Sequence, residues 1–175
     1  MMQVRTTIRV PLDVALKCGC DFTVRPKWDN VLYELISYEK TADLSYLRCS
    51  YCFKAPVMIS DREFYLEQVI RKDYPEPGLT CMIADSLPIN DTEFPMKKGR
   101  VRGDINIAIV FKPIVDPVTG NEHTEIVMTN RTDINGLVPK WLVNTMSRSV
   151  PRVWFKTYEL GCFKYMEEVK KLEHK

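Results

Sequence analysis

The side chains that most often carry catalysis are scarce in this chain. It holds 2 histidines, His123 beside a predicted hairpin turn and His174 close to the C-terminal end. General acid–base catalysis needs a histidine or a pair of carboxylates gathered in one pocket. No nucleophile and base occur in a pattern that would bring them together. We therefore predict neither an active site nor a cofactor.

Metal binding through cysteines is the second chemistry that the residue types allow. The 6 cysteines are Cys18, Cys20, Cys49, Cys52, Cys81 and Cys162. The two-residue gap between Cys49 and Cys52 is one that zinc ligands use. Residues 45–53 alternate like a strand, however, and three steps along a strand turn two side chains to opposite faces. We therefore predict reduced, partly buried thiols and no metal.

The bulk properties of the chain exclude several classes of protein. Its 175 residues are enough for one domain with a real core, which we expect to span residues 1–175. The net charge of +2 with both signs intermixed lacks the basic stripe of a nucleic-acid-binding protein. No run of about 18 apolar residues and no signal-peptide layout is present. We expect a cytoplasmic protein with no nucleic-acid partner.

The elements that must position the remaining side chains are mostly strands. A strand is predicted over residues 3–10 and a short helix over 11–18, where Pro11 suits a first helical turn. Further strands are predicted over 30–38, 44–53, 62–71, 78–86, 100–112 and 123–130. Their short links, without helical periodicity between them, predict an antiparallel sheet. Inward-facing Arg62 and Gln68 would need polar partners there.

The last quarter of the chain predicts one long helix that begins near Val138. Pro151 should bend this helix or break it in two, because proline lacks a backbone donor. The part before Pro151 has a wide apolar surface, and the part after it has a single apolar face. That face comprises Trp154, Phe155, Tyr158, Cys162, Tyr165, Met166, Val169 and Leu172. The fold class is α+β, with one helix covering a curved sheet.

Four motifs, in order along the chain, resemble those of the StAR-related lipid-transfer (START) domains. The matching residues are Arg25, Trp28 and Asp29, then Asp61 to Phe64, Gly99 to Arg102, and Asp133 to Asn144. The resemblance covers residues 3–171. It implies a helix-grip fold whose sheet curls around the C-terminal helix and leaves a tunnel for one lipid. Family members usually have another helix and two strands ahead of the segment that matches residues 3–10.

The resemblance is greatest to phosphatidylcholine-transfer START domains, and it implies a headgroup site. Arg25 and Asp29 match the pair that handles the lipid phosphate, a role that suits a guanidinium held by a carboxylate. Tyr51 and Phe64 match two aromatic positions of the choline cage, and the other two fall on Asn106 and Asn130. Amides at those positions make ethanolamine, serine or inositol headgroups plausible alternatives to choline. Strand alternation places Asn106 on the opposite face unless a bulge intervenes.

The resemblance also implies a lid, formed by the start of the helix and a loop near residues 53–61. The predicted tunnel and lid residues are Phe53, Arg62, Val138, Trp141, Leu142 and Met146. Trp141 is a candidate anchor at a membrane interface. The predicted function is to carry one phospholipid between membranes, with transient contact at the membrane surface. The alternatives are a sensor that retains its lipid and a helix-grip enzyme; no protein partner is predicted.

Overall fold

The structure is a computed structural model that describes residues 1–55, 59–88, 90, 92 and 94–173. The side chains of Lys140, Leu142 and residues 145–149 lie outside this description. The elements in chain order are β1 (Met2–Ile8), α1 (Leu12–Cys20), the 3-10 helix η1 (Arg25–Lys27), β2 (Leu32–Lys40), β3 (Tyr46–Phe53), β4 (Asp61–Lys72), β5 (Thr80–Ser86), β6 (Arg100–Arg102), β7 (Asp104–Val115), β8 (Glu122–Asp133) and α2 (Lys140–Glu173).

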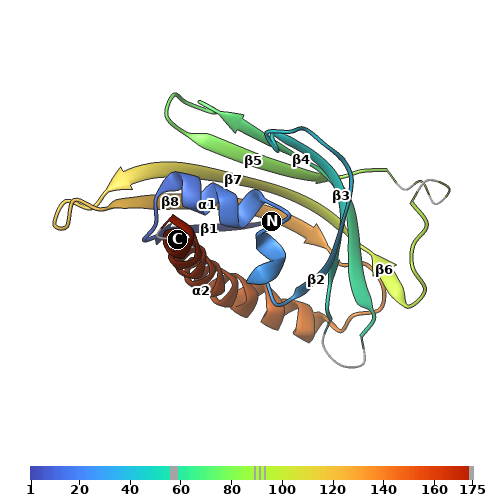
Figure 1. The fold of residues 1–175 in the computed structure, drawn as a ribbon. Helices are drawn as coiled ribbons and strands as arrows, with labels where there is room; N and C mark the ends of the chain where they lie inside the picture. Colours follow the sequence, from blue (N-terminus) through green and yellow to red (C-terminus); the bar gives the residue numbers. More distant parts are fainter. Residues whose placement is uncertain (56–58, 89, 91, 93, 174–175) are drawn as a thin grey trace.

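One curved sheet faces the long helix α2, and α1 lies near the C-terminal end of that helix (Figure 1). The strand order is β1-β8-β7-β5-β4-β3-β2, and each neighbouring pair is antiparallel. The short strand β6 adds a parallel pairing to β4. The predicted α+β helix-grip architecture is confirmed. No described helix has both the length and the apolar character needed to cross a bilayer.

The predicted strand over residues 100–112 is two strands, and Gly103 separates them. A Cβ at this position would lie 2.6 Å from Phe64 Cε1 and 2.8 Å from the carbonyl oxygen of Asp133. Only glycine therefore lets the chain cross here without displacing its neighbours. The backbone N–H of Gly103 donates to the carbonyl of Glu63, which attaches the crossing to β4.

Alternation along β3 and β4 places the side chains as predicted. Cys49 is buried in the core, whereas the Cys52 thiol, on the opposite face of β3, contacts the hydroxyl of Tyr33. The spacing of these two cysteines therefore does not bring them together. Inward-facing Gln68 is satisfied, because its amide donates to the carbonyl of Cys20 and accepts from the hydroxyl of Tyr51, both at 3.3 Å.

The helix α2 runs without interruption through Pro151, so of the two predicted outcomes, a bend or a break, the break is wrong. Proline removes only a single backbone donor, so the other hydrogen bonds of the helix can continue through it. In the second half, Gly161 allows close approach, since a Cβ there would lie 2.5 Å from the Trp28 ring. The hydroxyl of Tyr158 donates to the carbonyl of Ala15 in α1. The apolar face ends before Leu172, which is exposed.

Candidate functional site

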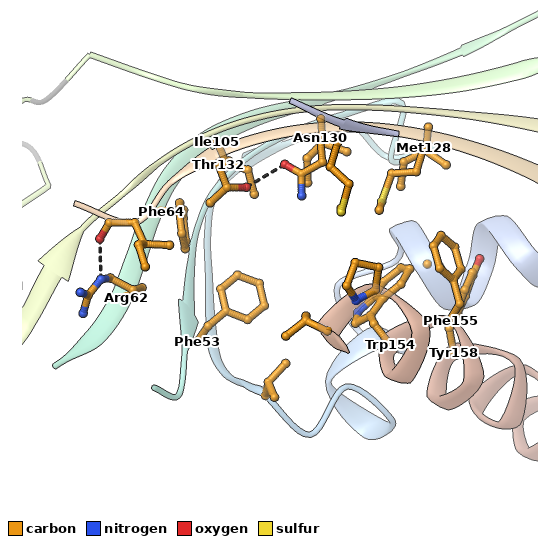
Figure 2. A pocket seen from close by; sticks show the side chains of 18 of the residues that line it. Phe53, Arg62, Phe64, Ile105, Met128, Asn130, Thr132, Trp154, Phe155 and Tyr158 are labelled. Atoms are coloured by element: carbon orange, nitrogen blue, oxygen red, sulfur yellow. Dashed lines mark hydrogen bonds between the residues drawn. The ribbon is translucent and has the colours of Figure 1, made fainter. Parts of the chain in front are cut away.

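A cavity of about 520 Å³ lies between the inner face of the sheet and α2 (Figure 2). Its volume falls within the roughly 300–1,000 Å³ of small-molecule sites. The walls are mainly aliphatic and aromatic, with side chains from the sheet facing Trp154, Phe155 and Tyr158 of the helix. The sheet contributes Phe53, Phe64, Ile105, Ile107, Ile109, Phe111, Ile126 and Met128. The interior is therefore hollow and apolar.

Strand alternation explains which side chains of β7 and β8 reach the cavity. The odd-numbered residues 105–111 of β7 and the even-numbered residues 126–132 of β8 line it. Asn130 and Thr132, at the end of the β8 row, introduce polar groups into this surface. The Thr132 hydroxyl donates to Asn130 Oδ1 at 2.7 Å (Figure 2). A ligand in the cavity would therefore meet one polar patch on the otherwise apolar surface of β7 and β8.

Arg25 supplies a charged group on the cavity wall. Its Nε donates to Asp29 Oδ2 at 3.1 Å, and Trp154 Nε1 donates to the same oxygen at 3.2 Å. The side chains of Arg25 and Asp29 are 12% and 1% exposed. The turn at η1 brings them together, because the Asp29 N–H donates to the Arg25 carbonyl. The pair is thus a buried ion pair, anchored to α2 through an indole.

The Arg25 guanidinium also contacts two aromatic rings. Its Cζ lies 5.1 Å from the ring centroid of Tyr51 and 5.7 Å from that of Trp154. Burial lowers the pKa of Arg25, but the charge of Asp29 and its hydrogen bond with Arg25 oppose this, and the pKa is raised overall. Burial raises the pKa of Tyr51, so the phenol is neutral at physiological pH. Arg25 therefore stays protonated between two ring faces.

Arg62 is a second arginine on the wall, and its partners are all backbone carbonyls. Nε donates to Ile134 and Nη1 to Ser60, while Nη2 donates to Asn135 at 3.1 Å (Figure 2 shows the Nε bond). Burial lowers the pKa of Arg62, and the neighbouring charge of Asp61 offsets this only in part. Arg62 therefore fastens β4 to the loop that precedes α2.

The cavity lining also includes Phe53, the described residues Lys54, Ala55 and Ile59 that follow it, and the segment before α2. Val138 lines the cavity, while Leu137 beside it is fully exposed. Trp141, in the first turn of α2, is 68% exposed. Residues 56–58 of the predicted lid loop, and the side chains of Leu142 and Met146, lie outside the described part of the chain. Around the start of α2, the described residues therefore include one apolar side chain that lines the cavity and two that face solvent.

The structure brings only some of the predicted headgroup residues together. Arg25, Asp29 and Tyr51 form one cluster, and Phe64 is the cross-strand partner of Tyr51 on β4. Asn130 lies on β8 and lines another part of the cavity. Asn106 is on the outer face of the sheet, exposed, where its amide donates to Asp85. The expectation that it faces the ligand is wrong. No bulge intervenes, since β7 and β8 pair in unbroken register.

Sequence reasoning missed the polar role of Trp154 and the contribution of Thr132. Trp154 was assigned to the apolar face of the helix, but its N–H partner, Asp29, lies 125 residues away in the chain. Helical periodicity does not identify such a partner. Thr132 could have been found, because it follows Asn130 by two residues on the same strand and so shares its face.

Comparison with known structures places the fold among START domains. Human STARD10 superposes with a TM-score of 0.77 at 19% identity, covering 99% of this chain and 67% of that one. Human StAR-related lipid transfer protein 5 gives 0.74 at 17% identity, covering 94% and 76%. A STAR-related lipid transfer protein fragment from Xanthomonas axonopodis gives 0.70 at 16% identity, covering 91% and 84%.

Sequence comparison adds no relative. No family model and no curated protein matches the chain. At identities of 16–19%, the three superpositions establish the fold and leave the ligand open. The chain therefore has the helix-grip fold of START domains.

Proposed function

We propose that this protein binds one phospholipid in its internal cavity and carries it between membranes. The observation that supports this most directly is the hollow, apolar interior under α2, with the Arg25–Asp29 ion pair on its wall. An apolar cavity suits acyl chains, and a single charged cluster within it suits a polar headgroup. The structural neighbours named as lipid-transfer proteins support the same class of ligand.

The energetics of acyl chains explain how such a carrier would work. Burying about 30 methylenes at about 0.8 kcal/mol each is worth on the order of 20 kcal/mol relative to water. The lipid would therefore not escape into water. A bilayer offers the chains nearly the same environment, so exchange between membrane and cavity is close to neutral in free energy. Headgroup contacts then decide which lipid is retained.

The start of α2 is the proposed contact with the membrane. Leu137 and Trp141 are exposed next to Val138, which lines the cavity. An aliphatic and an indole side chain suit the boundary between headgroups and acyl chains. Insertion of these residues would place the mouth of the cavity at the bilayer surface. Opening of this region would then set the rate of transfer. A cytoplasmic protein with peripheral membrane contact fits this role.

Native mass spectrometry after incubation with mixed-phospholipid vesicles tests the binding. We expect a mass increase of one phospholipid per chain, and lipid extraction identifies the species. Ile107→Trp, which fills the cavity, should abolish loading. Val110→Trp on the opposite face of the same strand is the matched control and should still load. A chain that stays free of lipid would refute the proposal.

A transfer assay between labelled vesicles separates a carrier from the alternative, a sensor. Rapid movement of lipid from donor to acceptor vesicles supports carriage. Loading without release to acceptor vesicles would refute carriage and favour a sensor that retains its ligand.

A further inference from the structure

We infer that the bound lipid has an anionic headgroup without a fixed cation, and that Arg25 binds its carboxylate or phosphate oxygens. This inference rests on the proposed function and narrows its ligand. It excludes choline as the preferred headgroup. Three features of the described residues carry it: the donors that Arg25 leaves unused, the occupation of nearby aromatic rings, and the charges on the cavity wall.

The first feature is the hydrogen-bonding capacity left on Arg25. Its Nε is committed to Asp29, and Nη1 and Nη2 have no acceptor among the described residues. Arg25 lines the cavity with a side chain that is 12% exposed, and its Nη1 and Nη2 are not among the fully buried atoms of the described residues that lack a partner. These donors are therefore accessible from the cavity, and a guanidinium edge matches a carboxylate or phosphate with two parallel hydrogen bonds. An oxyanion would satisfy these donors.

The second feature is that the aromatic faces near Arg25 are already occupied. The guanidinium lies 5.1 Å from the Tyr51 ring and 5.7 Å from the Trp154 ring. Quaternary ammonium groups are bound by several such faces together. A choline placed there would have to displace the guanidinium or lie beside its like charge. The geometry therefore disfavours a choline cage around Tyr51.

The third feature is the sign of the charges on the cavity wall. Its charged residues are Arg25, Lys54 and Arg62, and no aspartate or glutamate is among the described lining residues. The nearest carboxylate, Asp29, is 1% exposed and already accepts from Arg25 and Trp154. A cationic group in the cavity would thus meet no counter-charge, which is unfavourable at low dielectric. An anionic group would meet only cations.

Competition between two lipids tests the inference on the unaltered protein. Vesicles containing equal amounts of phosphatidic acid and phosphatidylcholine with identical acyl chains are incubated with the chain, and loading is read by native mass spectrometry. We expect roughly 10-fold preference for phosphatidic acid, the effect of one charge-assisted interaction. Equal loading, or a preference for phosphatidylcholine, would overturn the inference and leave the proposed function intact. Loading of neither lipid would refute the proposed function.

A double variant assigns the preference to Arg25. Arg25→Gln combined with Asp29→Asn removes both charges without stranding a buried carboxylate, and should load the two lipids equally. Arg5→Gln removes an arginine whose side chain is 74% exposed and should keep the preference. If the double variant does not fold, Arg25→Lys retains the charge but not the planar edge, and a several-fold smaller preference is expected. An undiminished preference in either Arg25 variant would overturn the assignment.

Inorganic phosphate distinguishes a lipid headgroup from a free ion as the occupant. Millimolar phosphate alone should neither stabilise the protein against heat nor displace phosphatidic acid, because it gains nothing from the apolar walls. Displacement of the lipid by phosphate at this concentration would identify the Arg25 site as one for the free ion and contradict the inference.

Discussion

Arg25 and Arg62 lie on the wall of the same cavity, but their donors go to different kinds of partner. Arg25 pairs with a buried carboxylate through Nε and leaves its terminal nitrogens to the cavity. Arg62 gives all three nitrogens to backbone carbonyls of the segments on either side. The pKa of Arg25 is raised, whereas that of Arg62 is lowered.

This difference separates a side chain that holds the fold from one that is available to a ligand. A guanidinium whose donors all meet carbonyls of two segments ties those segments together. A guanidinium that is oriented by one carboxylate keeps a free edge in a fixed direction. Position on a cavity wall therefore does not by itself identify a ligand-binding arginine; the distribution of its hydrogen bonds does.

Arg25→Ala should have the largest effect on stability. It leaves Asp29, whose side chain is 1% exposed, without its counter-charge, and breaking a buried ion pair this way costs about 3–5 kcal/mol. Urea unfolding at neutral pH measures the loss. The combined Arg25→Gln and Asp29→Asn variant should lose clearly less. Equal losses would mean that Asp29 does not depend on Arg25.

Arg62→Ala should cost less, about 2 kcal/mol, because it removes hydrogen bonds without stranding a charge. Freed from this attachment, the loop before α2 should open more readily, so vesicle-to-vesicle transfer should become several-fold faster while equilibrium loading changes little. Stopped-flow transfer and native mass spectrometry measure the two quantities. Transfer at the unaltered rate would show that this arginine does not restrain the mouth.

Trp141→Ala should leave stability unchanged and slow transfer several-fold, because its side chain is exposed and its proposed role is to anchor the mouth at a bilayer. Val153→Ala is the control, since Val153 is 64% exposed further along the same helix. Transfer rates and equilibrium loading should be compared for both variants. A parallel fall in the two quantities for Trp141→Ala would contradict an anchoring role.

The smallest effect is expected from the Arg9–Glu159 ion pair, on the surface. Arg9 donates to Glu159, and although burial raises the pKa of Glu159, its bonds to Arg9 lower it overall. A carboxylate whose folded-state pKa is lowered stabilises the fold above its unfolded pKa, and this is lost as pH falls through the folded pKa. Arg9→Ala should therefore make the loss of folding stability on acidification slightly less steep, below about pH 4.3. Thermal melts from pH 6 to 3 test this; an effect as large as that of Arg25→Ala would remove the distinction between buried and exposed pairs.

The sequence predicted the fold better than the site, and the residues show why. Apolar residues that repeat every two residues indicate strands, and those that repeat every three to four indicate helices. The strands of the sheet and α2 were therefore predicted to within a few residues of their bounds. The division at Gly103 depends on close contacts with distant segments, which periodicity does not report. The continuity through Pro151 was not predicted, because the prediction followed the general effect of proline on helices. For Asn106, alternation was the better guide than the match to family positions.

The site depended on contacts that no local pattern encodes. Arg62 reaches carbonyls 72 and 73 residues away, and Trp154 bonds a carboxylate 125 residues away. Arg25 and Asp29, by contrast, are four residues apart, and a single turn joins them. The predictions were therefore most successful where neighbours in the chain are also neighbours in space.

Because the interior is hollow, the stability of the folded chain also depends on whether a ligand fills it. An occupant that binds only the native state adds about 2.7 kcal/mol at a hundredfold excess over its dissociation constant. That amount is a sizeable share of the stability of an ordinary domain. Empty molecules would unfold more often and be degraded sooner than filled ones. In the proposed role, the cellular abundance of this protein would therefore follow the supply of its cargo.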